Sequence, residues 1–351
     1  MAQETMAQNK TVQVALVKGE DRYSNITSAL ELIADQVNLR GKERILIKPN
    51  FVSIHHPLAA THVDAVRAVL DFLRQRSDAW ITIGEGAALG DTLEGYRHYG
   101  YTDLVKEYKV ELIDLNRGEW IEAPVYNSSF KTMNLRLSKA AVESDLRISV
   151  GPPKTHDTVI ITLSLKNMVM GSLIREQRQA GGSGPMTQAM KALAGVVPSQ
   201  VKNASVLTPI TGSLVGSLMH SDKRAMHMGY PLMNLNLYRL APYVRPHLAI
   251  IDGFEAMEGN GPTHGDPVDL RCAVASGDFL AADTVAAALM GVDIDEIGYL
   301  HYCKIKRLGE GDLTKIDIVG STLAECQRRF RLPSTVAAQR KWQIPGVERF
   351  L

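Results

Sequence analysis

The sequence predicts an α/β protein made of two α/β domains, each with a mainly parallel sheet, and a ligand cleft between them. Three observations support this fold class. Short apolar runs alternate with amphipathic stretches along the 351-residue chain. Several of these runs are apolar throughout, which is typical of parallel strands that helices cover on both faces. The chain is also longer than the roughly 100–150 residues of a common domain, so two domains are expected.

Strands and helices follow one another in a regular order. Residues 12–17 form an apolar, β-branched run that predicts a strand, and apolar residues at helical spacing over residues 26–37 predict the next helix. The pattern recurs with strands at 45–47 and 80–83 and helices at 63–73 and 93–108. Further strands are predicted at 110–115, 146–150, 247–251 and 316–319.

Composition shifts divide the chain into three parts. We expect an N-terminal α/β domain over residues 1–150, a second α/β domain over 151–330 and a C-terminal tail over 331–351. A glycine-rich cluster in residues 179–186 predicts a mobile loop, which could be a lid or a connector. The tail mixes basic and aromatic residues, so we expect it to pack either on a partner subunit of a homo-oligomer or on its own domain.

Composition also excludes several classes of protein. The 39 Lys and Arg residues balance 38 Asp and Glu residues, and no basic run is interleaved with aromatic residues, so nucleic-acid binding is not expected. No apolar run reaches the roughly 18 residues of a membrane span, and residues 1–10 lack the apolar segment of a secretion signal. We therefore expect a cytoplasmic protein. The three cysteines lack CxxC spacing, which disfavours a disulfide framework or a cysteine-bound metal cluster.

Four predicted strands end in polar segments. These segments are Lys48-Pro49-Asn50, Gly84-Glu85-Gly86, Lys154-Thr155-His156 and Asp252-Gly253. Ligands of open parallel sheets bind beyond the carboxyl ends of the strands, so the four segments are expected to meet in one cleft. Taken singly, each also has a structural interpretation, with Lys48 in solvent, the glycines in turns and Glu85 at a helix N-terminus.

Lys166 stands inside the otherwise apolar segment 163–171. A lysine in apolar surroundings either pairs with an anion or has its pKa lowered by desolvation. A paired Lys166 would bind a carboxylate or phosphate, whereas a neutral one could act as a base or nucleophile. The alternative is that its stem packs on the core while its ammonium group reaches water.

Histidines are the candidate acid–base or metal-binding groups. His156 is the candidate general acid or base, with Asp252 or Glu85 orienting either this ring or a metal ion. His156, His227 and His264 are candidate ligands of a divalent metal, because imidazole suits zinc, iron, nickel and copper. The glycine-rich stretch 252–267 predicts a loop that frames a ligand, although it lacks the P-loop pattern.

These patterns lead to two functional hypotheses. The first is an enzyme that acts on a small anionic metabolite, a carboxylate or phosphate, by histidine and lysine acid–base chemistry, with or without a metal. Its catalytic candidates are His156, Lys166, Asp252 and Glu85, and its substrate-binding candidates are Lys48, Asn50, Lys154 and Asn167. The second is a non-catalytic accessory protein that carries a metal or cofactor for a partner.

The chain resembles the large prokaryotic family known as domain of unknown function 362 (DUF362). The resemblance rests on the four strand-end segments, on the block from Ser164 to Gly171, and on the glycines that follow Asp252. It implies an α/β fold over residues 12–319 and gives no reaction. Many relatives carry an iron–sulfur module, whereas this chain has no cysteine cluster for one.

The chain is also distantly similar to nickel-pincer lactate racemases. Those enzymes place a histidine ten residues before a lysine that holds the cofactor, which is the spacing of His156 and Lys166. This similarity implies a cleft between two α/β domains and a point of cofactor attachment at Lys166. The racemase lysine follows a pair of glycines, whereas Ser164 and Leu165 stand here.

Overall fold

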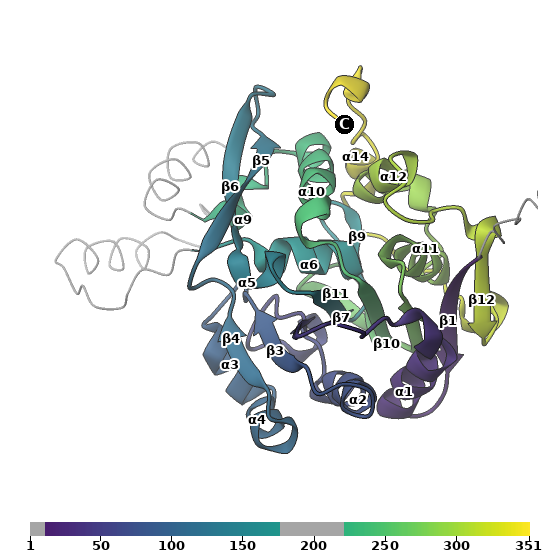
Figure 1. Cartoon of the computed structure of the whole chain (residues 1–351). Helices are drawn as coiled ribbons and strands as arrows, with labels where there is room; N and C mark the ends of the chain where they lie inside the picture. The colour runs from purple at the N-terminus through teal and green to yellow at the C-terminus, as the bar shows by residue number, and fades with distance from the viewer. Residues whose placement is uncertain (1–10, 176–220) are drawn as a thin grey trace, which may run out of the picture.

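The chain folds around one large sheet with helices on both faces (Figure 1). The computed structural model describes residues 11–175 and 221–351. The strands of the large sheet are β1 (Val12–Lys18), β2 (Arg44–Lys48), β3 (Trp80–Glu85), β4 (Glu111–Asp114), β7 (Leu146–Gly151), β8 (Lys154–His156), β9 (Ile160–Thr162), β10 (Leu248–Asn260), β11 (His264–Ser276) and β12 (Ile316–Gly320). Their order is β12-β1-β11-β10-β7-β2-β3-β4, with β8 paired to β10 and β9 to β8. A separate hairpin consists of β5 (Trp120–Tyr126) and β6 (Thr132–Ser138).

Most neighbouring strands of the large sheet run parallel. β4, β3, β2, β7 and β10 pair in parallel, as do β1 and β12, whereas β11 runs antiparallel to β1 and β10. This confirms the predicted α/β class with a mainly parallel sheet. β1 comes from the first predicted domain and both of its neighbours come from the second. Within the described residues, strands from the two predicted domains therefore share one sheet.

Helices cover both faces of this sheet (Figure 1). One face carries α1 (Arg22–Leu32), α2 (Val63–Arg74), α3 (Thr92–His98) and α4 (Thr102–Tyr108), and the other carries α6 (Ser164–Ser172), α10 (Tyr230–Val244), α11 (Phe279–Leu289) and α12 (Gly298–Ile305). Successive strand residues enter opposite cores. Leu46 packs in the core that includes α6 and α11, whereas Ile45 and Ile47 pack in the core that includes α1 and α2. Burial on both faces explains why these strands are apolar throughout.

Shorter helical segments connect these elements. They are α5 (Lys139–Val142), α9 (Asp222–Ala225), α13 (Leu323–Cys326) and α14 (Val336–Gln339), with 3-10 turns at Ala34–Gln36, Pro57–Ala59, Ile294–Glu296, Leu313–Lys315 and Val347–Arg349. The helix expected over residues 93–108 is two helices, α3 and α4. Gly100, with a positive φ of 76°, lies between them and allows the turn.

The prediction that residues 252–267 form a loop that frames a ligand is wrong. This stretch is the end of β10, a short turn and the start of β11, and the two strands pair as far as Asn260 and His264. Its glycines serve close backbone packing instead of a loop. A Cβ on Gly253 would lie only 2.9 Å from the Cys272 carbonyl oxygen of the paired strand.

The C-terminal tail packs on its own chain, which is one of the two arrangements expected for it. Trp342 is 3% exposed, and its Nε1 donates to the Glu296 carbonyl oxygen at 2.8 Å. The Phe350 ring stacks on Phe130, with 4.9 Å between the ring centroids, and meets Tyr126 edge-on. The tail thereby covers α10, α12 and the β5–β6 hairpin.

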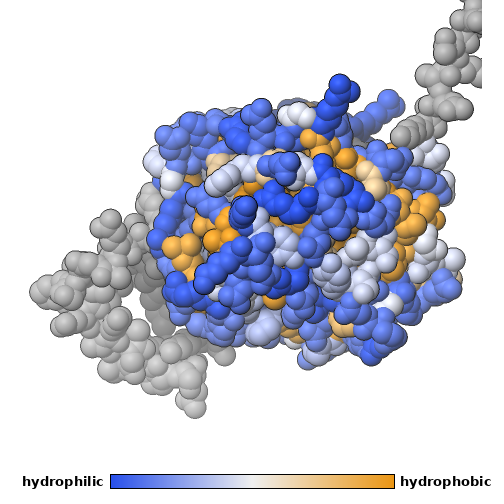
Figure 2. Space-filling model, turned by 60° about the horizontal axis from the view of Figure 1, so that its bottom comes forward, coloured by the Kyte–Doolittle hydropathy of each residue, from blue (hydrophilic) through white to orange (hydrophobic). Residues whose placement is uncertain are grey.

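The remaining sequence expectations concern the surface and the loop 179–186. That loop lies outside the described residues. The face shown in Figure 2 is mostly hydrophilic, with apolar side chains in scattered patches. In the part of the chain that the structure describes, no helix has the length and apolar character needed to cross a bilayer.

Candidate functional site

A cavity of about 790 Å³ lies beside the carboxyl ends of β2 and β3 and against α6. It is of the size that small-molecule sites usually have. Its lining residues come from both sides of the predicted domain boundary at residue 150. They are Asn50, Phe51, Val52, Glu85, Gly86, Ala88, Leu89, Gly90, Asp91, His156, Thr162, Lys166, Asn167, Met170, Gly171, Arg175, Ser221, Lys223, Arg224, His227 and Pro262.

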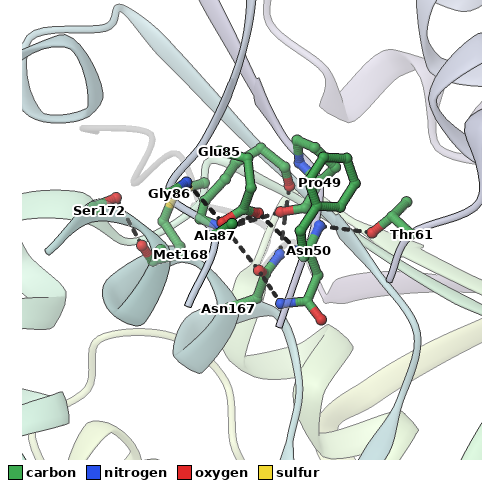
Figure 3. A network of polar contacts seen from close by, with 12 residues as sticks. Pro49, Asn50, Thr61, Glu85, Gly86, Ala87, Asn167, Met168 and Ser172 are labelled. Carbon is green, nitrogen blue, oxygen red and sulfur yellow. Dashed lines mark hydrogen bonds and ion pairs between the residues drawn. The ribbon is translucent and has the colours of Figure 1, made fainter. Parts of the chain in front are cut away.

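Lys48 and Glu85 form a buried ion pair at the base of this region. Lys48 is 0% exposed, and its Nζ lies 2.8 Å from Glu85 Oε2. The same Nζ donates to Asn167 Oδ1 and to the Pro49 carbonyl oxygen, each at 2.8 Å, while Gly86 N donates to Glu85 Oε1. Figure 3 shows Glu85 and Asn167 in this network. Burial lowers the pKa of Lys48, and the Glu85 carboxylate opposes that shift. Lys48 Nζ thus makes three hydrogen bonds to protein, and Glu85, which also lines the cavity, accepts from three donors.

Two glycines allow α6 to lie directly against this ion pair. A Cβ on Gly171 would collide with the Lys48 side chain and lie 3.0 Å from Glu85 Oε1. A Cβ on Gly86 would collide with the Gly171 carbonyl oxygen and lie 2.8 Å from Lys223 Nζ. The small residues in the family-like segments are therefore required by packing around Lys48.

Lys154 and Asn50 form a second buried contact. Lys154 Nζ donates to Asn50 Oδ1 and, at 3.2 Å, to the Ala59 carbonyl oxygen. Burial, together with the nearby Lys166 charge, lowers the pKa of Lys154 to about 7. Asn50 Nδ2 in turn donates to Asn167 Oδ1 at 3.1 Å. Of the four predicted binding residues, Asn50 and Asn167 line the large cavity, whereas Lys48 and Lys154 lie behind them.

Lys166 lies in the first turn of α6 and lines the cavity. Its side chain is 7% exposed, and burial lowers its pKa to about 8. Among the residues that the structure describes, its Nζ has neither a hydrogen-bond acceptor nor an ion-pair partner. The alternative in which the ammonium group reaches bulk water does not fit this burial.

Two histidines line the same cavity, and their backbone partners give them opposite tautomers. His156 Nδ1 accepts from Thr158 N at 3.0 Å, so the neutral ring carries its proton on Nε2. His227 Nδ1 donates to the Lys223 carbonyl oxygen at 2.9 Å, so its Nε2 keeps a lone pair. Burial lowers the pKa of both rings, so both are neutral near pH 7. Asp157 Oδ1, 3.1 Å from His156 Nδ1, would accept from that ring once it is protonated.

Three cations at the cavity were not predicted. Lys223 is buried, its Nζ donates to the Gly86 carbonyl oxygen at 2.6 Å, and burial lowers its pKa to about 7. The Arg175 guanidinium donates to the Ala88 carbonyl oxygen at 2.6 Å. Arg224 is exposed, and its guanidinium has no partner in the described ranges. Spacing is the sequence signal that could have identified Lys223, because this lysine stands one helical turn before the predicted site residue His227.

Among the described residues, the cavity is lined by more basic than acidic side chains. Its lining cations are Lys166, Arg175, Lys223 and Arg224. Its lining carboxylates are Glu85 and Asp91, and each is already paired with a cation outside the lining. Lys48 pairs with Glu85 at 2.8 Å, and Arg117 pairs with Asp91 at 2.6 Å. A ligand would therefore meet more positive than negative charge from the described lining, even though Lys223, with a pKa of about 7, is only about half protonated at neutral pH.

Two predicted site residues lie elsewhere. Asp252 is buried and pairs with Arg22, whose Nε lies 3.1 Å from its carboxylate oxygens, and it does not line the cavity. His264 is exposed, with Nδ1 2.9 Å from Thr263 Oγ1. The hairpin turn presents Pro262 to the cavity and leaves His264 outside it. The described residues also contain no group of three or more His, Cys, Asp or Glu side chains that could hold a metal ion. The predicted set of three imidazole ligands is therefore not assembled.

Asp283 fixes the position at which α6 begins. This residue of α11 is 0% exposed, and its carboxylate accepts from Ser164 N at 2.9 Å and from Leu165 N at 3.2 Å. Burial raises its pKa to about 7. The contact satisfies amide groups that no residue within α6 can reach, and it holds the turn that carries Lys166.

Known proteins resemble this chain to different extents. Residues 45–288 match the family described as Domain of unknown function (DUF362). A thylakoid-associated protein of Synechocystis sp. is 26% identical over 273 residues, which cover 77% of this chain and 70% of the relative. The lactate racemase apoprotein of Thermoanaerobacterium thermosaccharolyticum is 19% identical over 47% of this chain and 40% of its own, with a TM-score of 0.33. A Thermotoga maritima protein is 11% identical over 78% and 60%, with a TM-score of 0.43.

The lengths of these matches differ. The chain spans less than two thirds of either solved structure, and it spans 70% of the thylakoid-associated relative. The family match, in contrast, covers most of this chain and includes β2, β3, α6, α9 and β10, the elements that build and surround the cavity. On this match, the chain belongs to the DUF362 family.

Proposed function

We propose that the chain is an enzyme that binds a small anionic metabolite, a carboxylate or phosphate, in the cavity and transfers a proton to or from it. One observation carries this proposal. Lys166 is buried and unpaired within the described residues, and it lines a cavity whose carboxylates are already neutralised. A buried cation without a partner is unfavourable, and an anionic ligand would supply the missing partner.

The two histidines would supply the acid–base chemistry. At neutral pH, Nε2 of His156 can donate a proton and Nε2 of His227 can accept one. Asp252 and Glu85, which were predicted to orient a histidine, are paired with Arg22 and Lys48. The backbone groups of Thr158 and Lys223 hold the two histidine rings instead. A well-aimed proton-transfer group contributes on the order of 10²- to 10⁴-fold to a rate, which is the loss expected for His156→Ala.

Native mass spectrometry of the untreated protein tests the binding step. We expect a co-purified anion, or binding of added inorganic phosphate or citrate, and we expect Lys166→Met to abolish it. Lys106→Met is the matched control, because Lys106 is an exposed lysine of α4 that does not line the cavity. Unchanged binding in Lys166→Met would show that this lysine only packs.

The second hypothesis, a carrier of a metal or cofactor, keeps one supporting observation. His156 and His227 are both neutral and line the same cavity, so two of its three predicted ligands stay together. Elemental analysis of gently purified protein separates the two functions. A stoichiometric transition metal that His227→Ala removes would favour the carrier, whereas metal near zero would make metal delivery untenable.

A further inference from the structure

Four lysines of the described chain are buried around this site, and three of them donate hydrogen bonds to protein oxygens. Lys48 donates to three oxygens, and Lys154 and Lys223 each donate to two. Lys166 lines the cavity and differs from all three, because its Nζ has no acceptor among the described residues. The fold therefore leaves one buried amine open to a ligand.

This amine belongs to a cluster with the two imidazoles. The Lys166 charge lowers the pKa of His156 and of His227, and the His227 ring lowers the pKa of His156. Their backbone hydrogen bonds leave one Nε2 as a proton donor and the other as a proton acceptor. An amine beside such a pair has the proton transfers that addition to a carbonyl group requires.

We propose that Lys166 is a nucleophile that forms an imine with the carbonyl carbon of an oxo acid bound in the cavity. The proposal rests on the proposed function, because the oxo acid is the anionic metabolite of that function. The Lys166 nitrogen attacks the carbonyl carbon, a C–N bond forms, and the C–O bonds break in two stages. In the first stage His227 accepts one proton from the nitrogen and His156 donates one to the oxygen, which gives a carbinolamine. In the second stage protonated His227 returns its proton to the hydroxyl group, which leaves as water, and the second nitrogen proton passes to His156, so both rings are restored. No oxidant or reductant is needed.

The surroundings of Lys166 favour an acid as the carbonyl compound. Arg224 adds an exposed guanidinium with no partner in the described part of the chain, and guanidinium groups bind carboxylates through two parallel hydrogen bonds. Phe51, Leu89 and Met170 give the same cavity an apolar wall. The expected ligand is therefore a short-chain oxo acid. Its carboxylate would bind Arg224, its carbonyl group would lie at Lys166, and its carbon chain would lie along this wall.

Reductive trapping tests this proposal. The intact protein is incubated with glyoxylate, the smallest aldehyde acid, and reduced with borohydride, and each lysine is then mapped by peptide mass spectrometry. Near pH 8 a lysine with a pKa of about 8 is half neutral, whereas an ordinary exposed lysine is less than about 1% neutral. A less basic amine is also a weaker nucleophile, so we expect labelling of Lys166 about tenfold faster than labelling of Lys106 or Lys131. Lys154, which donates to protein oxygens, should stay unlabelled.

Lys166→Arg separates this proposal from the proposed function, because arginine keeps the positive charge and cannot form the imine. We expect this variant to bind inorganic phosphate by native mass spectrometry and to lose the adduct. Wild-type protein that binds phosphate but labels Lys166 no faster than Lys106 would overturn the imine and leave the proposed function intact. Wild-type protein that forms the adduct but binds neither phosphate nor citrate would keep the imine while contradicting the anion site.

Discussion

Replacing Glu85 by glutamine should reduce the free energy of unfolding by about 3–5 kcal/mol, the usual cost of breaking a buried ion pair on one side. Glutamine keeps the size of the side chain but leaves the Lys48 ammonium, which is 0% exposed, without a counter-charge. Its remaining partners, Asn167 Oδ1 and the Pro49 carbonyl oxygen, are neutral. Since burial already lowers the pKa of Lys48, loss of the carboxylate should lower that pKa further.

Urea unfolding followed by circular dichroism measures this loss, and the chain offers a matched control. Lys139 and Glu119 form an ion pair with the same 2.8 Å separation, but the Glu119 side chain is 78% exposed. Glu119→Gln should therefore leave the free energy of unfolding within experimental error. Adding Lys48→Met to Glu85→Gln should recover part of the loss, because it removes the unpaired charge. A loss below about 1 kcal/mol for Glu85→Gln would refute the role assigned to this pair.

Three further changes test other parts of the site. Gly171→Ala should destabilise the protein by about 1–3 kcal/mol in urea unfolding, because its Cβ would overlap the Lys48 side chain, and unchanged stability would contradict that packing. At pH 8, where a carboxyl group with a pKa of about 7 is mostly ionised, Asp283→Asn should speed hydrogen exchange at the Ser164 and Leu165 amides, which lose a carboxylate acceptor; equal exchange rates would argue against this cap. Lys166 has a folded pKa of about 8, below its value in the unfolded chain, so the unfolded state binds more protons above that pH and wild-type stability should rise from near pH 8 to pH 10. Lys166→Met should show a smaller rise than the wild type, because Lys154 and Lys223, with folded pKa values of about 7, still contribute to it. Parallel pH profiles would count against the burial of an open amine.

Much of the fold could be predicted because its strands are buried on both faces. Runs such as the one around Leu46 are apolar without interruption, so they stand out from the amphipathic helices beside them. β11 was missed for the opposite reason. Its first residues, His264 to Pro267, are polar or turn-forming, and they belong to a strand because β10 pairs with them. That pairing is a tertiary property that local patterns do not reveal.

The separation of Asp252 from the site follows from the two-residue period of a strand. Leu46 faces the core that includes α6, and Lys48, two residues later, lies against α6 as well. Ile250 faces the core that includes α1, so Asp252 meets Arg22 of that helix. The four strand-end segments were expected to meet in one cleft, but Asp252 does not line the cavity. The face on which each side chain leaves the sheet decides whether it reaches the cavity.

The polar residues of the family-like segments thus form two groups. Some have hydrogen-bond and ion-pair partners within the protein, and others have none among the described residues. Lys48, Glu85 and Gly171 are fully explained by contacts with one another, so substitutions there should act through stability and would be felt with or without a ligand. Lys166 has no hydrogen-bond or ion-pair partner within the described residues, and the nearby Asp157 charge opposes the effect of its burial only in part. Selection for stability alone would favour a methionine at such a buried position, since it fills a similar volume without a charge. An anionic ligand would supply the partner that Lys166 lacks among the described residues. On this difference between Lys166 and the paired Lys48 we base the proposal that the ligand binds in the cavity.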